Sequence, residues 1–347
     1  MQTKKILFSI VIPYLYKPKI LSECLKSILN QNINKNLFEV IIIDDGSKKD
    51  SQMIISKYRK LIYKLSYIKL IDNSGPGLAR NIGIKKAIGN YIFFLDCDDF
   101  IKPNTLIELK KIIETKNYDV VSFNYELVDN IKKKFMRNDK DILNVKKQKF
   151  IKLFLSMNYN NSVIFAIYKR SYILKNKIFF KTGYHEDILF FFKSFFYIKS
   201  KIFINKNLYV KKSISNSIIN TFSEKHIHDY LTSWIDVKEF LIKKYTSRYF
   251  NKFFLKYYSK GLIGLVAILI LKNIKFNKYN KFRRFFYYKI ILHKINKLYI
   301  NDINKSKVNI KSRYDKLFKY FIHYTQIESN NKNFISYEEN IKKIGLI

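Results

Sequence analysis

The sequence of 347 residues predicts an α/β protein built on a mostly parallel sheet flanked by helices, with a basic and mainly helical C-terminal extension. Three observations lead to this prediction. Short apolar runs alternate with segments of helical periodicity over the first 125 residues. Acidic or turn-forming residues follow these runs, and strand and turn signals become rare after about residue 223. A chain of this length can bury a sizeable core in one large domain or in two smaller ones.

Five segments have the nearly continuous apolar character of strands that are buried on both faces. In chain order they are Ile6–Ile12, Val40–Ile43, Tyr67–Ile71, Tyr91–Leu95 and Asp119–Phe123. Helices are predicted between them. Ile20–Leu29 has apolar residues at helical spacing, and a second helix begins near Ser51 with Asp50 as its N-cap. Pro76 and Pro103 are placed to start two more. Repeated strand–helix units of this length predict parallel strands with helices on both faces.

The composition excludes a disordered chain, because 48% of the residues are apolar. The formal net charge of +39 favours phosphate-bearing partners such as nucleic acid, an anionic membrane surface or a phosphorylated small molecule. A second explanation competes with this one. Lys, Ile, Asn, Tyr and Phe are all abundant, whereas Gly and Pro occur only 9 and 4 times, as a drift toward AT-rich codons would produce.

Several features predict a cytoplasmic protein. The two cysteines, Cys24 and Cys97, cannot form a disulfide framework and have no metal-ligand spacing. We interpret the first apolar run as a strand and not as a signal peptide, because it lacks a small-residue cleavage site. The longest uncharged apolar run, Gly261–Leu271, is shorter than the roughly 20 residues that span a bilayer.

Clustered carboxylates follow two of the predicted strands. Asp44 and Asp45 come after the second strand, and Asp96, Asp98 and Asp99 come after the fourth. Ligands of such sheets bind at the carboxyl ends of the strands. An aspartate after a strand is often only a turn residue. Two clusters at one edge would repel each other, however, so we expect a cation between them.

A hard divalent cation, Mg²⁺ or Mn²⁺, is the expected cofactor. Such ions prefer oxygen ligands and often retain water or substrate phosphate in their coordination shell. The alternating carboxylates of Asp96 and Asp98 at the strand end can hold such an ion. A cation at this position would stabilise a diphosphate leaving group.

Three stretches resemble family-2 glycosyltransferases with the GT-A fold. They are SIVIPYLYKPKILSECLKSILNQ, VIIIDDGSKKDS and NSGPGLARNIGIKKAIGNYIFFLDCDDFIKP, and they occur in the family's order and at its usual separations. The resemblance is dense over residues 6–125 and thinner to about residue 217. It implies an inverting enzyme that uses a nucleotide sugar and Mg²⁺ or Mn²⁺, with Asp98 as the predicted metal ligand.

The resemblance also implies roles for individual residues of a donor site. Asp45 is expected to meet the nucleotide base, Arg80 to face the nucleotide, and Asp96 to lie near the ribose. Pro13 and Asp44 are included in the same donor site. One position departs from the family pattern, because Leu15 stands where the family has a Tyr that stacks on the base. This departure leaves the identity of the nucleotide open.

The segment Gly183–Phe190 resembles the family's Glu-Asp-x-x-Phe signature, in which a carboxylate deprotonates the acceptor hydroxyl. An inverting transfer needs a base on the face opposite the leaving group. Asp187 is the predicted base, with Glu186 as the alternative. Both residues could also serve only to begin the apolar helix that follows, since acidic residues are common in a first helical turn.

The basic C-terminal region allows three interpretations. Lys238–Lys319 contains 22 Lys or Arg residues against 3 Asp or Glu residues. The region could complete the acceptor side of the site, rest on an anionic membrane surface, or bind nucleic acid. We expect contact with the membrane and no nucleic-acid binding, because aromatic and basic residues alternate in Lys281–Lys289 and no nucleic-acid module is recognisable. The protein would then lie at the inner face of the cell membrane, near a lipid-linked glycan acceptor.

The predicted organisation is a GT-A domain over residues 1–222 and a basic helical region over residues 223–347. The predicted function is hexosyl transfer from a nucleoside-diphosphate sugar, with a UDP-sugar expected, to a hydroxyl of a growing surface glycan such as a capsule or lipooligosaccharide. Two alternatives remain: a nucleotidyltransferase that makes the sugar nucleotide, and a non-catalytic basic protein that binds membrane or nucleic acid. The absence of a glycine-rich loop after the first strand argues against the former.

Overall fold

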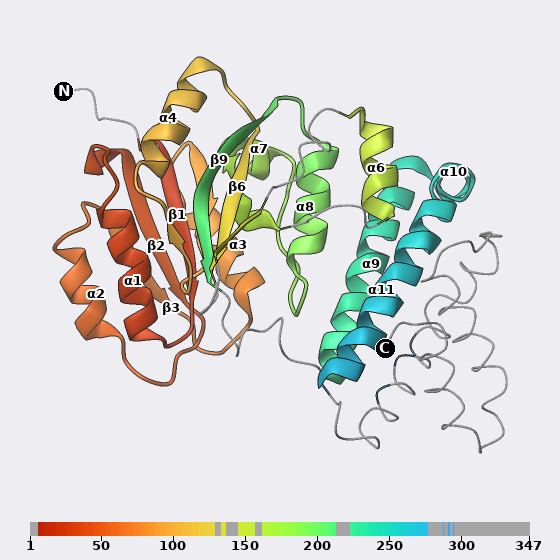
Figure 1. Ribbon diagram of the computed structural model, residues 1–347, viewed down its shortest axis with the longest axis horizontal. Coiled ribbons are helices and arrows are strands. Elements are labelled where there is room, and N and C mark those ends of the chain that lie inside the picture. Colours follow the sequence, from red (N-terminus) through yellow and green to blue (C-terminus); the bar gives the residue numbers. More distant parts are fainter. Residues whose placement is uncertain are drawn as a thin grey trace. The chain divides into compact units, whose positions relative to one another are not determined.

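The computed structural model describes residues 6–128, 133–136, 145–156, 162–212 and 223–276, together with residues 287, 291 and 294. The chain divides into two compact units, which are described separately. The first comprises Met1–Lys147 and Asn160–Ile218, and the second comprises Gln148–Tyr159 and Ile219–Ile347. The first unit contains a sheet with helices on both of its faces (Figure 1).

Nine strands form the sheet of the first unit, in the order β3-β2-β1-β4-β8-β6-β9-β5, with β7 paired to β6. Their bounds are β1 Phe8–Tyr14, β2 Phe38–Asp44, β3 Leu65–Lys69, β4 Tyr91–Phe94, β5 Phe100–Ile101, β6 Val120–Val128, β7 Lys133–Met136, β8 Ala166–Lys169 and β9 Lys201–Lys212. Strands β3, β2, β1 and β4 are parallel to one another, as are β6 and β9. The short strand β8 lies antiparallel between β4 and β6. The predicted α/β class is therefore confirmed, and the sheet is mixed.

Every residue of β1 and β2 is buried, which explains why both strands read as continuous apolar runs. The helices and 3-10 turns of this unit are α1 Pro18–Leu29, η1 Lys35–Leu37, α2 Gln52–Arg59, α3 Pro76–Lys86, α4 Thr105–Thr115, η2 Val163–Phe165, α7 Arg170–Lys175 and α8 Asp187–Phe196. The N-cap of α2 is Ser51 and not the predicted Asp50, which lies one residue earlier and accepts a hydrogen bond from the backbone N–H of Gln52 at 2.9 Å. Helix α4 begins two residues after the predicted Pro103.

Helix α3 packs unusually close to the central strand β1. A Cβ atom at Gly83 would lie 2.2 Å from Cγ1 of Val11, a distance that real Cβ atoms do not reach. Only a residue without a side chain therefore lets the helix lie this close to the strand. This close approach brings the first turn of α3 to the carboxyl edge of the sheet.

The second unit is helical over its described residues. Its helices are α6 Lys147–Leu155, α9 Glu224–Tyr245, α10 Ser247–Phe253 and α11 Leu255–Phe276. Trp234 of α9 forms the centre of its core, with its ring stacked 5.8 Å from Phe154 and 6.1 Å from Tyr258 between ring centroids. Gly261 lets α11 approach α6, since a Cβ there would lie 1.9 Å from the carbonyl oxygen of Leu155.

The predicted helical character of the C-terminal extension holds for residues 223–276. The predicted domain boundary at residue 222 lies outside the described residues. The same is true of the aromatic–basic segment Lys281–Lys289 except for residue 287. Helix α6, which precedes the predicted boundary in sequence, belongs to the second unit apart from its first residue. No helix in the described parts of the chain is both long enough and apolar enough to cross a membrane.

Candidate active site

The carboxyl ends of three neighbouring parallel strands, β2, β1 and β4, carry the predicted donor residues. Asp44 ends β2, Tyr14 ends β1 directly opposite it, and Asp96 lies two residues after β4. Pro13 is buried within β1 and pairs with Ile43. Because parallel strands run in one direction, these residues meet at the same edge of the sheet.

Asp44 is fully buried and its carboxylate is already hydrogen-bonded. It accepts one hydrogen bond from the backbone N–H of Ser47 at 2.9 Å and a short one from the hydroxyl of Tyr67. Burial, followed by the interaction with Asp44, raises the pKa of Tyr67, so the phenol remains a donor. These contacts hold the turn after β2, which supports the neighbouring Asp45.

Asp45 holds two loops together. Its two carboxylate oxygens accept hydrogen bonds from the backbone N–H groups of Ser74 and Gly75, each at 2.8 Å. Gly46 has φ of 76°, and a Cβ there would lie 2.5 Å from the backbone carbonyl carbon of Asp72. Glycine is therefore required at this close crossing of the loops. Asp45 thus lies at the N-terminal side of α3, next to the parallel strand ends.

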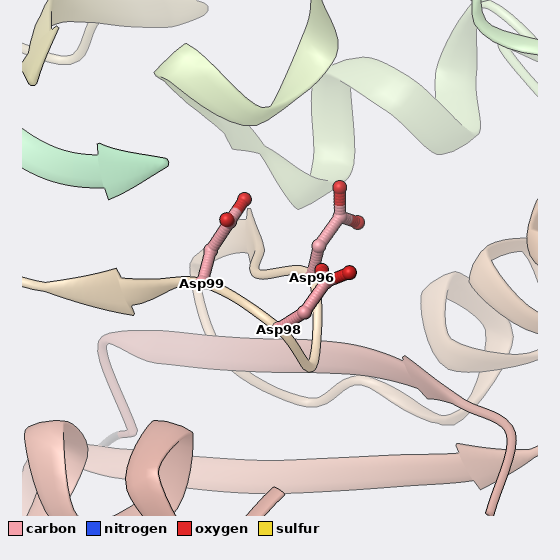
Figure 2. Close-up of side chains that lie close together, drawn as sticks. All are labelled: Asp96, Asp98 and Asp99. Carbon is pink, nitrogen blue, oxygen red and sulfur yellow. The ribbon is translucent and has the colours of Figure 1, made fainter. Parts of the chain in front are cut away.

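Three aspartates gather on the turn between β4 and β5. Asp96, Asp98 and Asp99 each contribute a carboxylate oxygen to a group in which all the oxygens lie within 4.8 Å of one another. Figure 2 shows their side chains extending from one short turn. Asp99 is anchored by strand β9: it accepts a hydrogen bond from the hydroxyl of Tyr209 at 2.7 Å and one from the backbone N–H of Lys212 at 2.8 Å.

The electrostatics of this cluster favour a cation. Burial, together with the charges of Asp96 and then Asp98, raises the pKa of Asp99 to about 8. Burial and the charge of Asp96 also raise the pKa of Asp98. The ammonium of Lys17 lies 3.9 Å from a carboxylate oxygen of Asp98, and both side chains are partly exposed. An ion pair with this separation and exposure compensates little of the repulsion.

The residues at the turn therefore fit a divalent cation. Three carboxylates close together form the all-oxygen donor set that Mg²⁺ and Mn²⁺ prefer. The pKa values of Asp98 and Asp99 are raised by burial and then by neighbouring negative charge, which a bound cation would neutralise. Asp98, the predicted ligand, and Asp96 are the part-buried members of the group, while Asp99 is buried and anchored to β9.

Arg80 of α3 links the aspartate turn to the start of α8. Its side chain is only 7% exposed. One guanidinium nitrogen donates to Asp96 at 2.7 Å and another donates to Glu186 at 2.6 Å. The guanidinium also lies 5.4 Å from the ring centroid of Phe180. Burial disfavours the charged form, but the negative charges of Asp96 and Glu186 outweigh it, so the pKa of Arg80 is raised.

Glu186 and Asp187 lie at the first turn of α8 in different surroundings. Glu186 precedes the helix and is bound to Arg80, whereas Asp187 is its first residue. Burial and then the charge of Glu186 raise the pKa of Asp187 to about 7, against the opposing effect of Arg80. A carboxylate with a pKa near neutrality is suited to accept a proton from a hydroxyl group.

Leu15, the residue that departs from the family pattern, lies between two tyrosines whose surroundings differ. Tyr14 is buried, and its hydroxyl is bonded to the hydroxyl of Ser51 at 2.9 Å. Leu15 is 43% exposed at the strand end. Tyr16 is half-buried, with the ammonium of Lys49 5.6 Å from its ring centroid. Tyr16 is therefore the more accessible of the two aromatic rings that flank Leu15.

The predicted residues fall into three groups. Arg80, Asp96 and Glu186 are joined by direct ion pairs. Asp98 belongs to the neighbouring aspartate cluster, and Asp187 follows Glu186 on α8. Pro13, Asp44 and Asp45 lie at the carboxyl ends of β1 and β2.

Sequence reasoning missed three residues that support the site. Tyr209 and Lys17 contact the aspartate cluster, and Asn81 contacts the segment before α8. Tyr209 is 110 positions from its partner Asp99, and Asn81 is 99 positions from its partner Phe180. No local pattern could have revealed these contacts, although Asn81 follows Arg80 within one of the family-like motifs.

The first unit thus combines a mixed α/β sheet with a carboxylate turn that fits a cation and an adjacent Glu–Asp pair. Residues 9–177 match the family described as Glycosyl transferase family 2. This part of the chain belongs to that family, and the first unit has its GT-A fold.

Two curated relatives and one solved structure illustrate the similarity. The poly(ribitol-phosphate) beta-N-acetylglucosaminyltransferase TarS of Staphylococcus aureus is 36% identical over 115 residues, which cover 33% of this chain and 20% of TarS. TarP of the same organism, described by the same activity, is 31% identical over 185 residues, which cover 50% of this chain and 52% of TarP. The crystal structure of S. aureus TarS 1-349 in complex with UDP-GlcNAc has a TM-score of 0.59 at 20% identity, with 90% and 92% of the two chains covered.

These comparisons establish family and fold. The matched sequence spans about a fifth of TarS and about half of TarP. The structural likeness extends over most of both chains, but at 20% sequence identity it shows only that the two chains share a fold.

Proposed function

We propose that the protein is an inverting glycosyltransferase that moves a hexosyl group from a UDP-sugar to a hydroxyl of a growing surface glycan. The observation that carries the proposal is the chain of contacts from Asp96 through Arg80 to Glu186, with Asp187 next to it. These contacts connect a carboxylate turn suited to a cation with a carboxyl group whose pKa is about 7.

Asp187 acts as the base in the proposed reaction. It takes the proton of the attacking hydroxyl as the hydroxyl oxygen forms a bond to C1 of the sugar. The bond between C1 and the diphosphate oxygen breaks at the same time, and UDP leaves with the bonding electrons. Attack from the face opposite the leaving group inverts the configuration at C1. Glu186 does not perform this role, because Arg80 already neutralises its carboxylate.

The aspartate turn would hold Mg²⁺ or Mn²⁺ through Asp98, with Asp96 and Asp99 beside it. When bound, the cation supplies positive charge that stabilises the departing diphosphate. Asp45 would meet the base, with Pro13 and Asp44 shaping the same edge, and Asp96 would lie near the ribose. Arg80 and Asp96 hold each other in place, which keeps the Asp96 carboxylate in one orientation.

The names of the relatives support the choice of substrates. TarS and TarP are described as acting on poly(ribitol-phosphate), and the structure similar to this chain is a complex with UDP-GlcNAc. A phosphate-rich surface polymer also suits a chain with a net charge of +39. We therefore take UDP-GlcNAc as the first donor to test, and poly(ribitol-phosphate) as the first acceptor.

The proposal includes a location at the inner face of the cell membrane. Lys and Arg residues of the C-terminal region would rest on anionic lipids, and a lipid-linked acceptor would then be within reach.

The test is binding and slow hydrolysis of a panel of UDP-, GDP- and dTDP-sugars, with and without Mn²⁺. Wild type and Asp98→Ala are compared, and Glu114→Gln on the exposed side of α4 is the control. We expect metal-dependent binding of one UDP-sugar, release of UDP, and loss of both in Asp98→Ala. If no nucleotide sugar binds under any metal condition, the proposal is wrong. Incorporation of a nucleoside triphosphate into a sugar nucleotide would instead identify a nucleotidyltransferase.

A further inference from the structure

The segment between β8 and α8 has an irregular backbone just before the Glu–Asp pair. Gly183 has φ of 95° and His185 has φ of 59°. The left-handed region is uncommon for a residue with a side chain and persists only where surrounding contacts impose it. The contacts that fix this segment therefore also fix the position at which α8 begins.

One face of α3 supplies these contacts. Gly77, Arg80 and Asn81 are three and four residues apart, so they share a face of the helix. A Cβ at Gly77 would lie 2.4 Å from the carbonyl oxygen of Lys181, so the segment rests directly on the first turn of α3. Arg80 binds Glu186 at the far end of the segment.

Asn81 binds the near end of the segment through two hydrogen bonds. Its Nδ2 donates to the carbonyl oxygen of Phe180 at 2.9 Å, and its Oδ1 accepts from the backbone N–H of Phe180 at 2.8 Å. An Asn side chain has one acceptor and one donor group at its end, and here both are used on one residue's backbone. This pairing fixes the position and the direction of the chain at Phe180. The ring of Phe180 in turn lies beneath the guanidinium of Arg80.

From these contacts we infer that Asn81 is a positioning residue for the base Asp187, acting through the segment Phe180–Glu186. The inference rests on the proposed function, in which Asp187 accepts the proton of the attacking hydroxyl. Asn81 touches neither the aspartate turn nor Asp187 in the contacts described above. Its removal is therefore expected to slow the chemical step and to leave nucleotide binding intact.

The experiment compares Asn81→Ala with wild type in two measurements. Calorimetric titration with UDP and Mn²⁺ gives the Kd and the number of binding sites per chain. UDP release from the preferred sugar donor, with water alone as the acceptor, gives kcat and KM for the donor. Lys85→Ala is the matched control, because Lys85 is exposed on the same helix.

We expect kcat per UDP-binding site to fall about 10- to 100-fold in Asn81→Ala, since a displacement of about 1 Å can cost this much. The Kd for UDP and the KM for the donor should stay within about twofold of wild type, and Lys85→Ala should match wild type in all respects. A purely structural role would reduce the number of binding sites but leave kcat per site unchanged, and that outcome would overturn the inference. A loss of UDP affinity as large as the loss of kcat would overturn the inference too.

Asn81→Asp covers the case in which Asn81→Ala does not fold. The Asp side chain keeps the shape and the acceptor but cannot donate to the carbonyl of Phe180. We expect kcat per UDP-binding site to fall in Asn81→Asp as well, while the Kd for UDP stays within about twofold of wild type. If wild type itself releases no UDP from any donor, the proposed function fails and the inference fails with it. If wild type is active and both variants retain its kcat, the inference alone is wrong.

Discussion

At the residue scale, Glu186 and Asp187 are neighbours in sequence with different chemistry. Glu186 is paired with Arg80, whereas burial gives Asp187 a pKa of about 7. We predict that Asp187→Asn lowers kcat for UDP release by about 10² to 10⁴, the usual contribution of a general base. Glu186→Gln should cost less, because it removes an orienting contact and keeps the base. Steady-state kinetics on the two variants check this order, and a larger loss in Glu186→Gln would exchange the two roles.

The protonation of Asp187 determines the direction in which kcat/KM changes with pH. The base works only when deprotonated, so kcat/KM should fall as the pH drops below about 7, with a tenfold decrease per pH unit. This limb of the profile should be missing in Asp187→Asn. A pH–rate profile of UDP release between pH 5 and 9 on both proteins is the measurement. A wild-type profile that is flat down to pH 5 would contradict the assignment.

At this scale, part of the candidate site could be predicted from the sequence. The positions of Asp45, Asp96 and Asp98 at the strand ends could be predicted, because these residues follow apolar runs and match a family motif. The contacts of Asp45 with Ser74 and Gly75 could not, since they join loops about 30 positions apart. Burial and the charge of Glu186 raise the pKa of Asp187, and both depend on how the chain folds.

At the element scale, the turn between β4 and β5 brings three carboxylates together, and Arg80 at Asp96 and the more distant Lys17 at Asp98 offset only part of their charge. We predict that Mn²⁺ raises the Tm of wild type and that Asp98→Asn loses this response. A cation at ten times its Kd stabilises the folded state by about 1.4 kcal/mol, which corresponds to a rise of roughly 2–4 °C. Thermal unfolding with EDTA or Mn²⁺ tests this, with Glu114→Gln expected to respond as wild type does. An equal response in Asp98→Asn would place the cation elsewhere.

The contact between α3 and β1 makes a second prediction at this scale. Gly83→Ala should destabilise the protein by about 1–3 kcal/mol, because the added methyl group overlaps Val11 and forces the helix outward. Val11→Ala in the same chain should recover part of that loss, with a coupling energy above about 0.5 kcal/mol. Urea unfolding of the single and double variants gives the free energies for this double-mutant cycle, and Lys85→Ala serves as the exposed control. Purely additive effects would show that the helix can move away at little cost.

The elements themselves were predictable to different degrees. Strands β1, β2 and β4 agree with their predicted segments to within about two residues at each end, because both of their faces are buried. Strand β9 has a mixed pattern of buried and exposed residues, and β8 is only four residues long. The pattern of β9 gives no continuous apolar run, and the four residues of β8 are too few to indicate its antiparallel insertion between β4 and β6.

At the scale of the whole molecule, positive charge is the dominant property. The net charge of +39 belongs to a chain whose described helices include none that could cross a bilayer. Codon drift and selection for an anionic partner would both produce such a composition, and only binding distinguishes them. Each Lys or Arg near an anionic surface contributes about 1 kcal/mol, and the attraction weakens with salt.

We therefore predict that the full-length protein co-sediments with vesicles of phosphatidylcholine and phosphatidylglycerol at 0.15 M NaCl. It should not co-sediment with vesicles of phosphatidylcholine alone, and binding should decrease strongly at 0.5 M NaCl as the Debye length shortens. Equal binding to both vesicle types would indicate an apolar contact instead of an electrostatic one. No binding to either would assign the charge to codon usage or to a polyanionic acceptor, and retention of the protein on poly(ribitol-phosphate) would then favour the acceptor.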